Sequence, residues 1–327
     1  MTTGFYAYTG TGCDVDSDAA WEYIRDGYLL GPRTVLKGWT KSPRSVLPDF
    51  PVDLNKIPFL VQQTLEAAIG NVTNLRRAVM FSGGFDSMLI ASLAQQAKAQ
   101  VAAVTIQFDD FNPLTVAGAI ECADKLGIDL HIIHVKVSEF LSAFEALSGV
   151  TDEPLLDLDL GVVYAAFKKY EPATAGDFFI SGMGADQWFG DIALEQSPGG
   201  LAARLDWAML DEHAHQQVAQ THGYRFFAPF LSLPMLALAQ YVPDDMKRDK
   251  NLLRALAMAK TIPHRGSRNE EQIPPFVRRI FIKTYGDRAW PSGVSCPSGH
   301  DFRESQLLRQ IILGLWLEKA KDRIIKV

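Results

Sequence analysis

The sequence predicts an α/β protein with a doubly wound, mostly parallel sheet and a helical C-terminal half. Three observations support this fold class. Short apolar runs that suit buried strands alternate with helical periodicity from residue 57 to residue 181. Two of these runs lead directly into a glycine loop, as the strands of βα units do. Beyond Asp191 the spacing of the apolar residues is helical.

Each element follows from its own residue pattern. Residues 1–55 are rich in Gly, Pro and Thr and show no sustained period, so we expect an irregular lead-in that packs on a larger domain. Strands are expected at short apolar segments, namely 76–81, 101–108, 130–137 and 177–181. Helices are expected where apolar residues recur three or four apart, namely 59–71, 87–99, 115–127, 138–149, 160–170, 206–220, 232–242, 251–260 and 302–324.

Composition excludes several classes of protein. The 327 residues are 47% hydrophobic and 21% charged, which is ordinary for a globular chain and excludes disorder and low complexity. A net charge of −6 provides no global positive field for nucleic acid or an anionic membrane. Three scattered cysteines form neither a disulfide framework nor a cysteine metal site. With no signal-peptide pattern, we expect a soluble cytoplasmic protein.

The segment SGGFDS, residues 82–87, lies between an expected strand and an expected helix. Ligands of open parallel sheets bind beyond the carboxyl ends of the strands, where backbone N–H groups and helix N-termini attract anions. The Asp86 carboxylate would repel a phosphate unless a divalent cation lay between them. The loop therefore predicts Mg²⁺ together with a polyphosphate, and the alternative is a structural turn that caps a helix. Phosphate contacts are expected from Ser82, Gly83, Gly84 and Ser87.

A second segment, SGMGADQWFGD at residues 181–191, again follows an expected strand and contains a carboxylate at Asp186. Two strand ends of one sheet could place Asp86 and Asp186 on either side of one metal–nucleotide complex. Taken alone, the second segment is equally consistent with a simple helix start that has Asp186 in its first turn.

These residues resemble a known family. SGGFDS resembles the pyrophosphate loop of the PP-loop ATP pyrophosphatase superfamily, which has a HUP-like fold. SGMGADQWFGD resembles the SGxGADExFGGY segment of the asparagine synthetase family, which includes the β-lactam synthetases, and Asp152-Glu153-Pro154 resembles that family's DEP segment. The similarity spans roughly residues 17 to 268. It implies a lead-in at 1–56 that resembles the end of a glutaminase domain with its linker, a synthetase domain at 57–290 and a C-terminal helical appendage at 291–327.

The resemblance implies an AMP-forming carbon–nitrogen ligase with ATP and Mg²⁺ as cofactors. A substrate carboxylate would attack the α-phosphate of ATP and displace pyrophosphate, and an amine would then convert the acyl-adenylate into an amide. The product would belong to small-molecule or specialised metabolism, and it would be a lactam if the amine were on the substrate itself. The implied pyrophosphate-binding residues are Ser82, Gly83, Gly84, Asp86, Ser87, Gly182 and Gly184, and the implied metal ligands are Asp86 and Asp186.

The sequence departs from the family at several positions. A glutaminase needs a cysteine directly after the initiator methionine, where this chain has Thr2, so we expect no glutamine hydrolysis. The family has Glu, or Tyr in β-lactam synthetases, where this chain has Met183, and Gln187 replaces the usual Glu. A thioether cannot accept a proton from the incoming amine. Glu212 lies about where β-lactam synthetases have the acid of their catalytic pair, whereas nearby His213 and His215 are expected at the surface.

The position of the family's late catalytic lysine has two alignments. Lys260 keeps a K-x5-G-S spacing but needs a deletion before it. Counting without gaps instead aligns Arg268 with the family's RPK arginine and puts Glu270 at the lysine. We favour Lys260 as the catalytic lysine, and the alternative is a solvated lysine at a helix end.

Two other functions stay open at this stage. A PP-loop enzyme that modifies tRNA would use the same loop, but it would usually need a basic docking surface. A catalytically degenerate ATP-binding subunit would account for Met183 and for the ambiguous lysine. A homodimer or a partner subunit is compatible with each of these functions.

Overall fold

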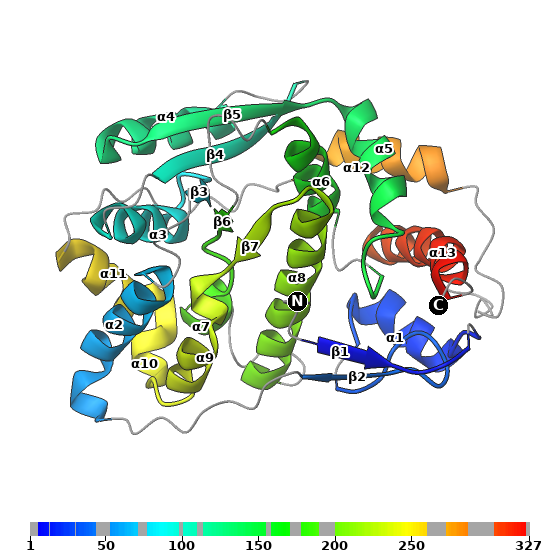
Figure 1. The fold of residues 1–327 in the computed structure, drawn as a ribbon, viewed down its shortest axis with the longest axis horizontal. Helices are drawn as coiled ribbons and strands as arrows, with labels where there is room; N and C mark the ends of the chain where they lie inside the picture. Colours follow the sequence, from blue (N-terminus) through cyan, green and yellow to red (C-terminus); the bar gives the residue numbers. More distant parts are fainter. Residues whose placement is uncertain are drawn as a thin grey trace.

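The computed structural model describes residues 6–12, 14–29, 31–43, 53–70, 77–97, 101–109, 114–154, 158–170, 178–189, 200–259, 273–286 and 304–324. Their central feature is a five-stranded parallel sheet with the strand order β5-β4-β3-β6-β7 (Figure 1). Its strands are β3 (Arg77–Met80), β4 (Val101–Phe108), β5 (Asp129–Val135), β6 (Phe178–Ile180) and β7 (Arg225–Phe227). The predicted doubly wound α/β fold is confirmed.

Both faces of the sheet are buried, as parallel sheets require. Alternation along the strands sends Val79 and Ile180 into one buried cluster and Ala78 and Phe179 into another. The first cluster contains residues from α2 (Ile57–Gly70), α3 (Phe85–Gln96), α4 (Leu114–Leu126), α7 (Ala185–Phe189), α9 (Leu233–Ala239) and α11 (Asn251–Ala259). The second contains residues from α1 (Ser17–Asp26), α5 (Val137–Leu147), α6 (Asp159–Lys169), α12 (Pro275–Tyr285) and α13 (Glu304–Ile324). The long helix α8 (Gly200–Thr221) contributes to both clusters.

The lead-in is more regular than its sequence predicts. β1 (Tyr6–Thr9) pairs antiparallel with β2 (Thr40–Pro43), and helix α1 lies between them in the chain. The sequence contains a capping residue at each end of α1. Asp16 accepts a hydrogen bond from the Ala19 N–H at 3.0 Å, and Gly27 ends the helix at φ 90°. The expectation of an irregular segment is therefore wrong for this helix.

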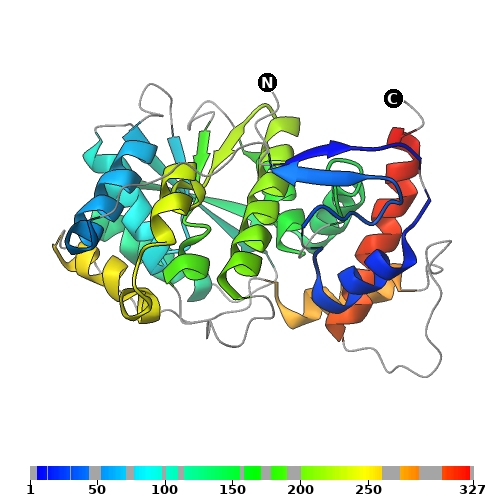
Figure 2. The same ribbon diagram turned by 90° about the horizontal axis from the view of Figure 1, so that it is seen from below.

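The lead-in packs against the C-terminal helix. α1 and α13 lie side by side at one end of the molecule in both views (Figures 1 and 2). The Arg309 guanidinium donates a hydrogen bond to the Arg25 carbonyl at 2.5 Å, at the end of α1. Because one buried cluster joins these helices to the sheet, the two ends of the chain share a core. The division into parts at 1–56, 57–290 and 291–327 stays a prediction.

Several short elements were not expected from the sequence. β7 has only three residues, too few for a visible alternation, and it extends the sheet beyond β6. Helix α12, α10 (Asp244–Lys247) and the 3-10 turns η1 (Leu54–Lys56), η2 (Pro229–Leu231) and η3 (Arg248–Lys250) are further additions. Within the described residues, no helix has both the length and the apolar character needed to cross a membrane.

Candidate functional site

The two glycine loops meet where the winding of the sheet reverses. From β3 the chain builds the sheet outward through β4 and β5, and it then returns to the other side of β3 to add β6 and β7 (Figure 1). β3 and β6 are therefore parallel neighbours, with Val79 opposite Ile180. Open α/β sheets bind their ligands at such a reversal, beyond the carboxyl ends of the strands. The segments 82–87 and 181–186 lie at this place.

The first loop folds against helix α4. Gly83 has a φ of +73°, and a Cβ at this position would lie 2.8 Å from the Ala119 Cα, so only glycine fits here. The Ser82 Oγ accepts a hydrogen bond from the Gly84 N–H at 3.2 Å. The buried Ser87 hydroxyl donates to the Gly84 carbonyl at 2.9 Å. The loop is thus held by its own hydroxyls, while Ser82 stays exposed at the N-terminal end of α3.

The second loop lies directly on the first. A Cβ at Gly182 would be 2.9 Å from the Asp86 Cβ and 3.1 Å from the Ser87 backbone nitrogen. Gly184 has a φ of +91°, and a Cβ there would be 2.6 Å from the Leu231 side chain. The two glycines of the second loop therefore permit contacts that any larger residue would prevent. The structure brings both predicted loops together.

Asp86 and Asp186 share a cation that the sequence analysis did not identify. The Lys250 Nζ lies 2.5 Å from the Asp86 Oδ2 and 2.6 Å from the Asp186 Oδ1. Lys250 comes directly before helix α11, a position where a cation faces the positive end of the helix dipole. The sequence signal for this contact was the lysine directly before an expected helix. A cation is unfavourable there unless carboxylates lie nearby.

Burial determines the electrostatics of this cluster. Burial raises the pKa of the Asp86 carboxyl, and Lys250 and Arg254 partly offset this effect because they favour the charged form. Burial lowers the pKa of the Lys250 ammonium, but the two carboxylates outweigh it, so the pKa is raised overall. The two carboxylates therefore favour a charged Lys250, whereas burial makes Asp86 easier to protonate than an exposed aspartate.

The carboxylate oxygens fit a magnesium ion. The Asp86 Oδ1 is buried and has no hydrogen-bond partner among the described residues. The side chain of Asp186 is 57% exposed, and the Arg204 guanidinium donates to its backbone carbonyl at 3.0 Å. Mg²⁺ in nucleotide sites is commonly held by one or two carboxylates together with substrate phosphates. An orphaned oxygen beside a second, accessible carboxylate matches that donor set.

The two residues considered for proton transfer lie in different surroundings. Met183 is half-buried, and its N–H donates to the Ser181 Oγ at 3.2 Å. Glu212 is fully buried on α8, and its Oε1 accepts from the Ala228 N–H at 2.8 Å and from the Gln216 amide at 3.2 Å. Burial raises the pKa of Glu212 to about 8. Its carboxyl thus supports the backbone that follows β7.

Glu212→Gln should change how stability depends on pH. The folded protein keeps a proton on Glu212 up to about pH 8, whereas the unfolded chain releases it near the ordinary pKa of 4.5. As the pH rises from about 4.5 to about 8, the free energy of unfolding of the wild type should therefore fall, by up to about 1.4 kcal/mol per pH unit. The variant should lose that slope, as urea denaturation at a series of pH values would measure. Parallel curves for the two proteins would contradict the buried, protonated state.

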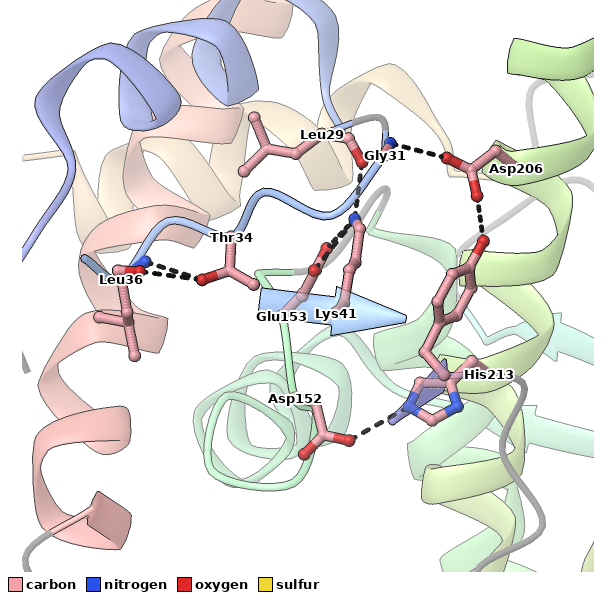
Figure 3. Close-up of polar contacts among 10 residues, drawn as sticks. Leu29, Gly31, Thr34, Leu36, Lys41, Asp152, Glu153, Asp206 and His213 are labelled. Carbon is pink, nitrogen blue, oxygen red and sulfur yellow. Dashed lines mark hydrogen bonds and ion pairs between the residues drawn. The ribbon is translucent and has the colours of Figure 1, made fainter. Parts of the chain in front are cut away.

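Asp152 and Glu153 of the DEP-like segment form polar contacts with α8 and β2, respectively (Figure 3). Lys41 points from β2 toward Glu153, with its Nζ 3.0 Å from the Glu153 Oε1. The Asp152 Oδ2 lies 3.1 Å from the His213 Nε2 on α8. These contacts join the lead-in, the DEP-like segment and α8.

The expectation that His213 and His215 lie at the surface is wrong. They are 5% and 8% exposed, respectively. His213 is covered by Tyr6 and Tyr8 of β1, and His215 stacks on Phe226 of β7. Neither covering strand was expected from the sequence.

Four residues named in the sequence analysis lie outside the part of the chain that the structure describes. Lys260 lies outside the described residues, as do Glu270, Arg268 and Thr2. Gln187 is half-buried in α7, next to Asp186 in the chain. The choice between Lys260 and Glu270 stays a prediction.

Comparisons with known proteins place part of the chain in a family. The family model described as Asparagine synthase matches residues 60–222, a stretch that contains both glycine loops. No curated protein matches the chain. Among solved structures, NMN synthetase from Francisella tularensis is similar with 14% identity and a TM-score of 0.35, over 81% of this chain and 95% of that one. The U34-tRNA thiolase NcsA from Methanococcus maripaludis, with its [4Fe-4S] cluster, is similar with 12% identity and a TM-score of 0.41, over 78% of this chain and 82% of that one.

Two glycine loops on neighbouring parallel strands thus lie inside the stretch that matches the family model. Residues 60–222 form an asparagine synthase domain of the PP-loop ATP pyrophosphatase superfamily.

Proposed function

We propose that the protein is an AMP-forming, ATP-dependent ligase that activates a small-molecule carboxylate and joins it to an amine. The observation that carries this proposal is the convergence of Asp86 and Asp186 on one cation position, beside a glycine loop at the N-terminal end of α3. A helix N-terminus with free backbone N–H groups suits a pyrophosphate group. The two carboxylates suit the metal that accompanies it.

In the proposed first step the substrate carboxylate attacks the α-phosphate and pyrophosphate leaves. The backbone of Gly83 and Gly84 and the Ser82 hydroxyl would hold the departing pyrophosphate, and Gly182 keeps the second loop close enough for Asp186 to take part. Mg²⁺ held by Asp86 and Asp186 would offset the charge on the leaving group. The buried Ser87 hydroxyl would act indirectly, by fixing the Gly84 carbonyl and thus the shape of the loop.

In the proposed second step an amine attacks the acyl-adenylate and releases AMP. The Met183 thioether cannot accept the amine's proton. Because its pKa is about 8, the Glu212 carboxyl is mostly protonated at neutral pH, and its Oε1 already accepts hydrogen bonds. We infer that the amine arrives with a low pKa or loses its proton to solvent. An amine on the substrate itself would give a lactam, and ammonia from solution or from a partner subunit would give a primary amide.

Exchange of labelled pyrophosphate into ATP tests this function. The purified protein should catalyse exchange only when Mg²⁺ and a suitable carboxylic acid are both present, and a panel of acids would identify the substrate class. Exchange that required tRNA would instead identify a tRNA-modifying enzyme, which the net charge of −6 disfavours. ATP binding without exchange, across the panel and with tRNA, would identify a degenerate subunit, the alternative that Met183 supports. We expect the reaction in the cytoplasm, where ATP is available.

A further inference from the structure

Lys250 lies in the space between two carboxylates that are proposed to bind a metal. Its side chain is 13% exposed, and its ammonium group is in direct contact with both Asp86 and Asp186. The three side chains together carry a charge of −1 when all are ionised. A divalent cation seeking both carboxylates would have to displace the ammonium group.

The backbone at Lys250 has an unfavourable, left-handed conformation. Among the described residues, Lys250 is the one non-glycine residue with a positive φ, at 55°. Left-handed backbone is unfavourable for a lysine, and so is a cation in front of a helix N-terminus. Strain of this kind persists where the surroundings determine it, which is often at functional sites. Contacts with two carboxylates are what offset it here.

Building on the proposed function, we propose that Lys250 is a specificity-determining residue that excludes free divalent cations from the Asp86–Asp186 site. A free metal ion would displace the ammonium group without offering it a new anionic partner, and the two positive charges repel each other. A metal ion bound to a polyphosphate brings negative oxygens that the displaced ammonium can contact. The site would therefore accept the metal–nucleotide complex and reject the metal alone.

The ammonium group has a second consequence for the nucleotide-free protein. Burial and then repulsion from Asp186 raise the pKa of the Asp86 carboxyl, and the Asp86 Oδ1 has no hydrogen-bond partner among the described residues to offset this effect. Lys250 holds the two carboxylates together until the nucleotide complex arrives. A predicted catalytic lysine at 260 would act separately, on the charge that develops during reaction.

Titration with Mn²⁺ alone, followed by the electron paramagnetic resonance signal of the free ion, tests this inference without turnover. Lys250→Met should bind Mn²⁺ at least roughly tenfold more tightly than the wild type, because a repelling charge is gone and both carboxylates are released. Lys250→Arg keeps the charge and should stay within about threefold of the wild type. Arg254→Met is the matched control, since Arg254 also favours the ionised Asp86, and it should change the affinity less than about threefold.

Two further measurements separate this role from a structural one. Adding Asp86→Asn to Lys250→Met should remove the gained Mn²⁺ affinity, which locates the ion at this site. Lys250→Met should also weaken binding of the Mg²⁺ complex of a non-hydrolysable ATP analogue by roughly tenfold, because the ammonium no longer reaches the phosphates. If Lys250→Met does not fold, as judged by its thermal transition, Lys250→Gln removes the charge while its amide can still donate to a carboxylate.

An Mn²⁺ affinity that is unchanged or weaker in the folded, uncharged variant would overturn the inference, and so would unchanged nucleotide binding. These outcomes are distinct from failure of the proposed function, which is judged by pyrophosphate exchange in the wild type. A wild type that binds Mn²⁺ alone as tightly as the variant does would equally contradict exclusion by Lys250.

Discussion

Asp86→Asn and Asp186→Asn should each lower carboxylate-dependent pyrophosphate exchange by roughly a thousandfold or more while leaving the fold intact. Asparagine keeps the size of the side chain but removes the charge that holds Mg²⁺ against the leaving pyrophosphate. Asp86 should be the more sensitive, because its buried Oδ1 has no hydrogen-bond partner among the described residues, whereas Asp186 is 57% exposed. Initial exchange rates at saturating Mg²⁺ would measure the loss.

A surface carboxylate provides the control for this prediction. Glu121→Gln removes a charge on α4 whose partner is Lys125, both residues being about half exposed, and it should leave exchange unchanged. Thermal unfolding should show that the Asp86 and Asp186 variants remain folded. Near-native exchange in either variant would mean that the residue concerned is not a metal ligand.

Lys41→Met should destabilise the protein by about 3–5 kcal/mol, the cost of leaving a buried charge without its partner. The side chain of Lys41 is fully buried, and its ammonium group contacts the Glu153 carboxylate and the Leu29 carbonyl. Burial raises the pKa of Glu153, and Lys41 is the largest influence that keeps it charged. Urea denaturation at neutral pH would give the change in the free energy of unfolding.

The double variant Lys41→Met with Glu153→Gln should recover a large part of that loss, because no uncompensated charge remains. Lys125→Met, which breaks an exposed pair with Glu121, should cost less than about 1 kcal/mol. A loss of similar size for Lys41→Met and Lys125→Met would show that the pair with Glu153 does not anchor the lead-in.

The parts of the fold that the sequence predicts are those in which local pattern and tertiary burial agree. β4 lies at residues 101–108, as its mostly apolar run indicates, and α4 ends at Leu126, directly before Gly127 with its positive φ of 64°. β7 has only three residues, so its place at the sheet edge depends on pairing with β6 and not on its own pattern.

The features of the candidate site that were predicted are likewise local in the sequence, and those that were missed depend on distant contacts. Both glycine loops were predicted, because a glycine that must adopt positive φ or admit a close contact is visible in the sequence. Lys250 was not predicted, since its role depends on a contact across 164 residues of chain with Asp86. The burial of His213 likewise depends on β1, a strand more than 200 residues away that covers it.

The most direct measurement is a crystal structure of the protein with Mn²⁺ and a non-hydrolysable ATP analogue, in which anomalous scattering locates the metal. We expect one Mn²⁺ ion coordinated by Asp86 and Asp186, the terminal phosphates on the backbone of residues 82–87, and the Lys250 ammonium moved from the carboxylates to a phosphate oxygen. A nucleotide bound elsewhere, or bound here with Lys250 still between the two carboxylates and the metal away from both, would contradict the account.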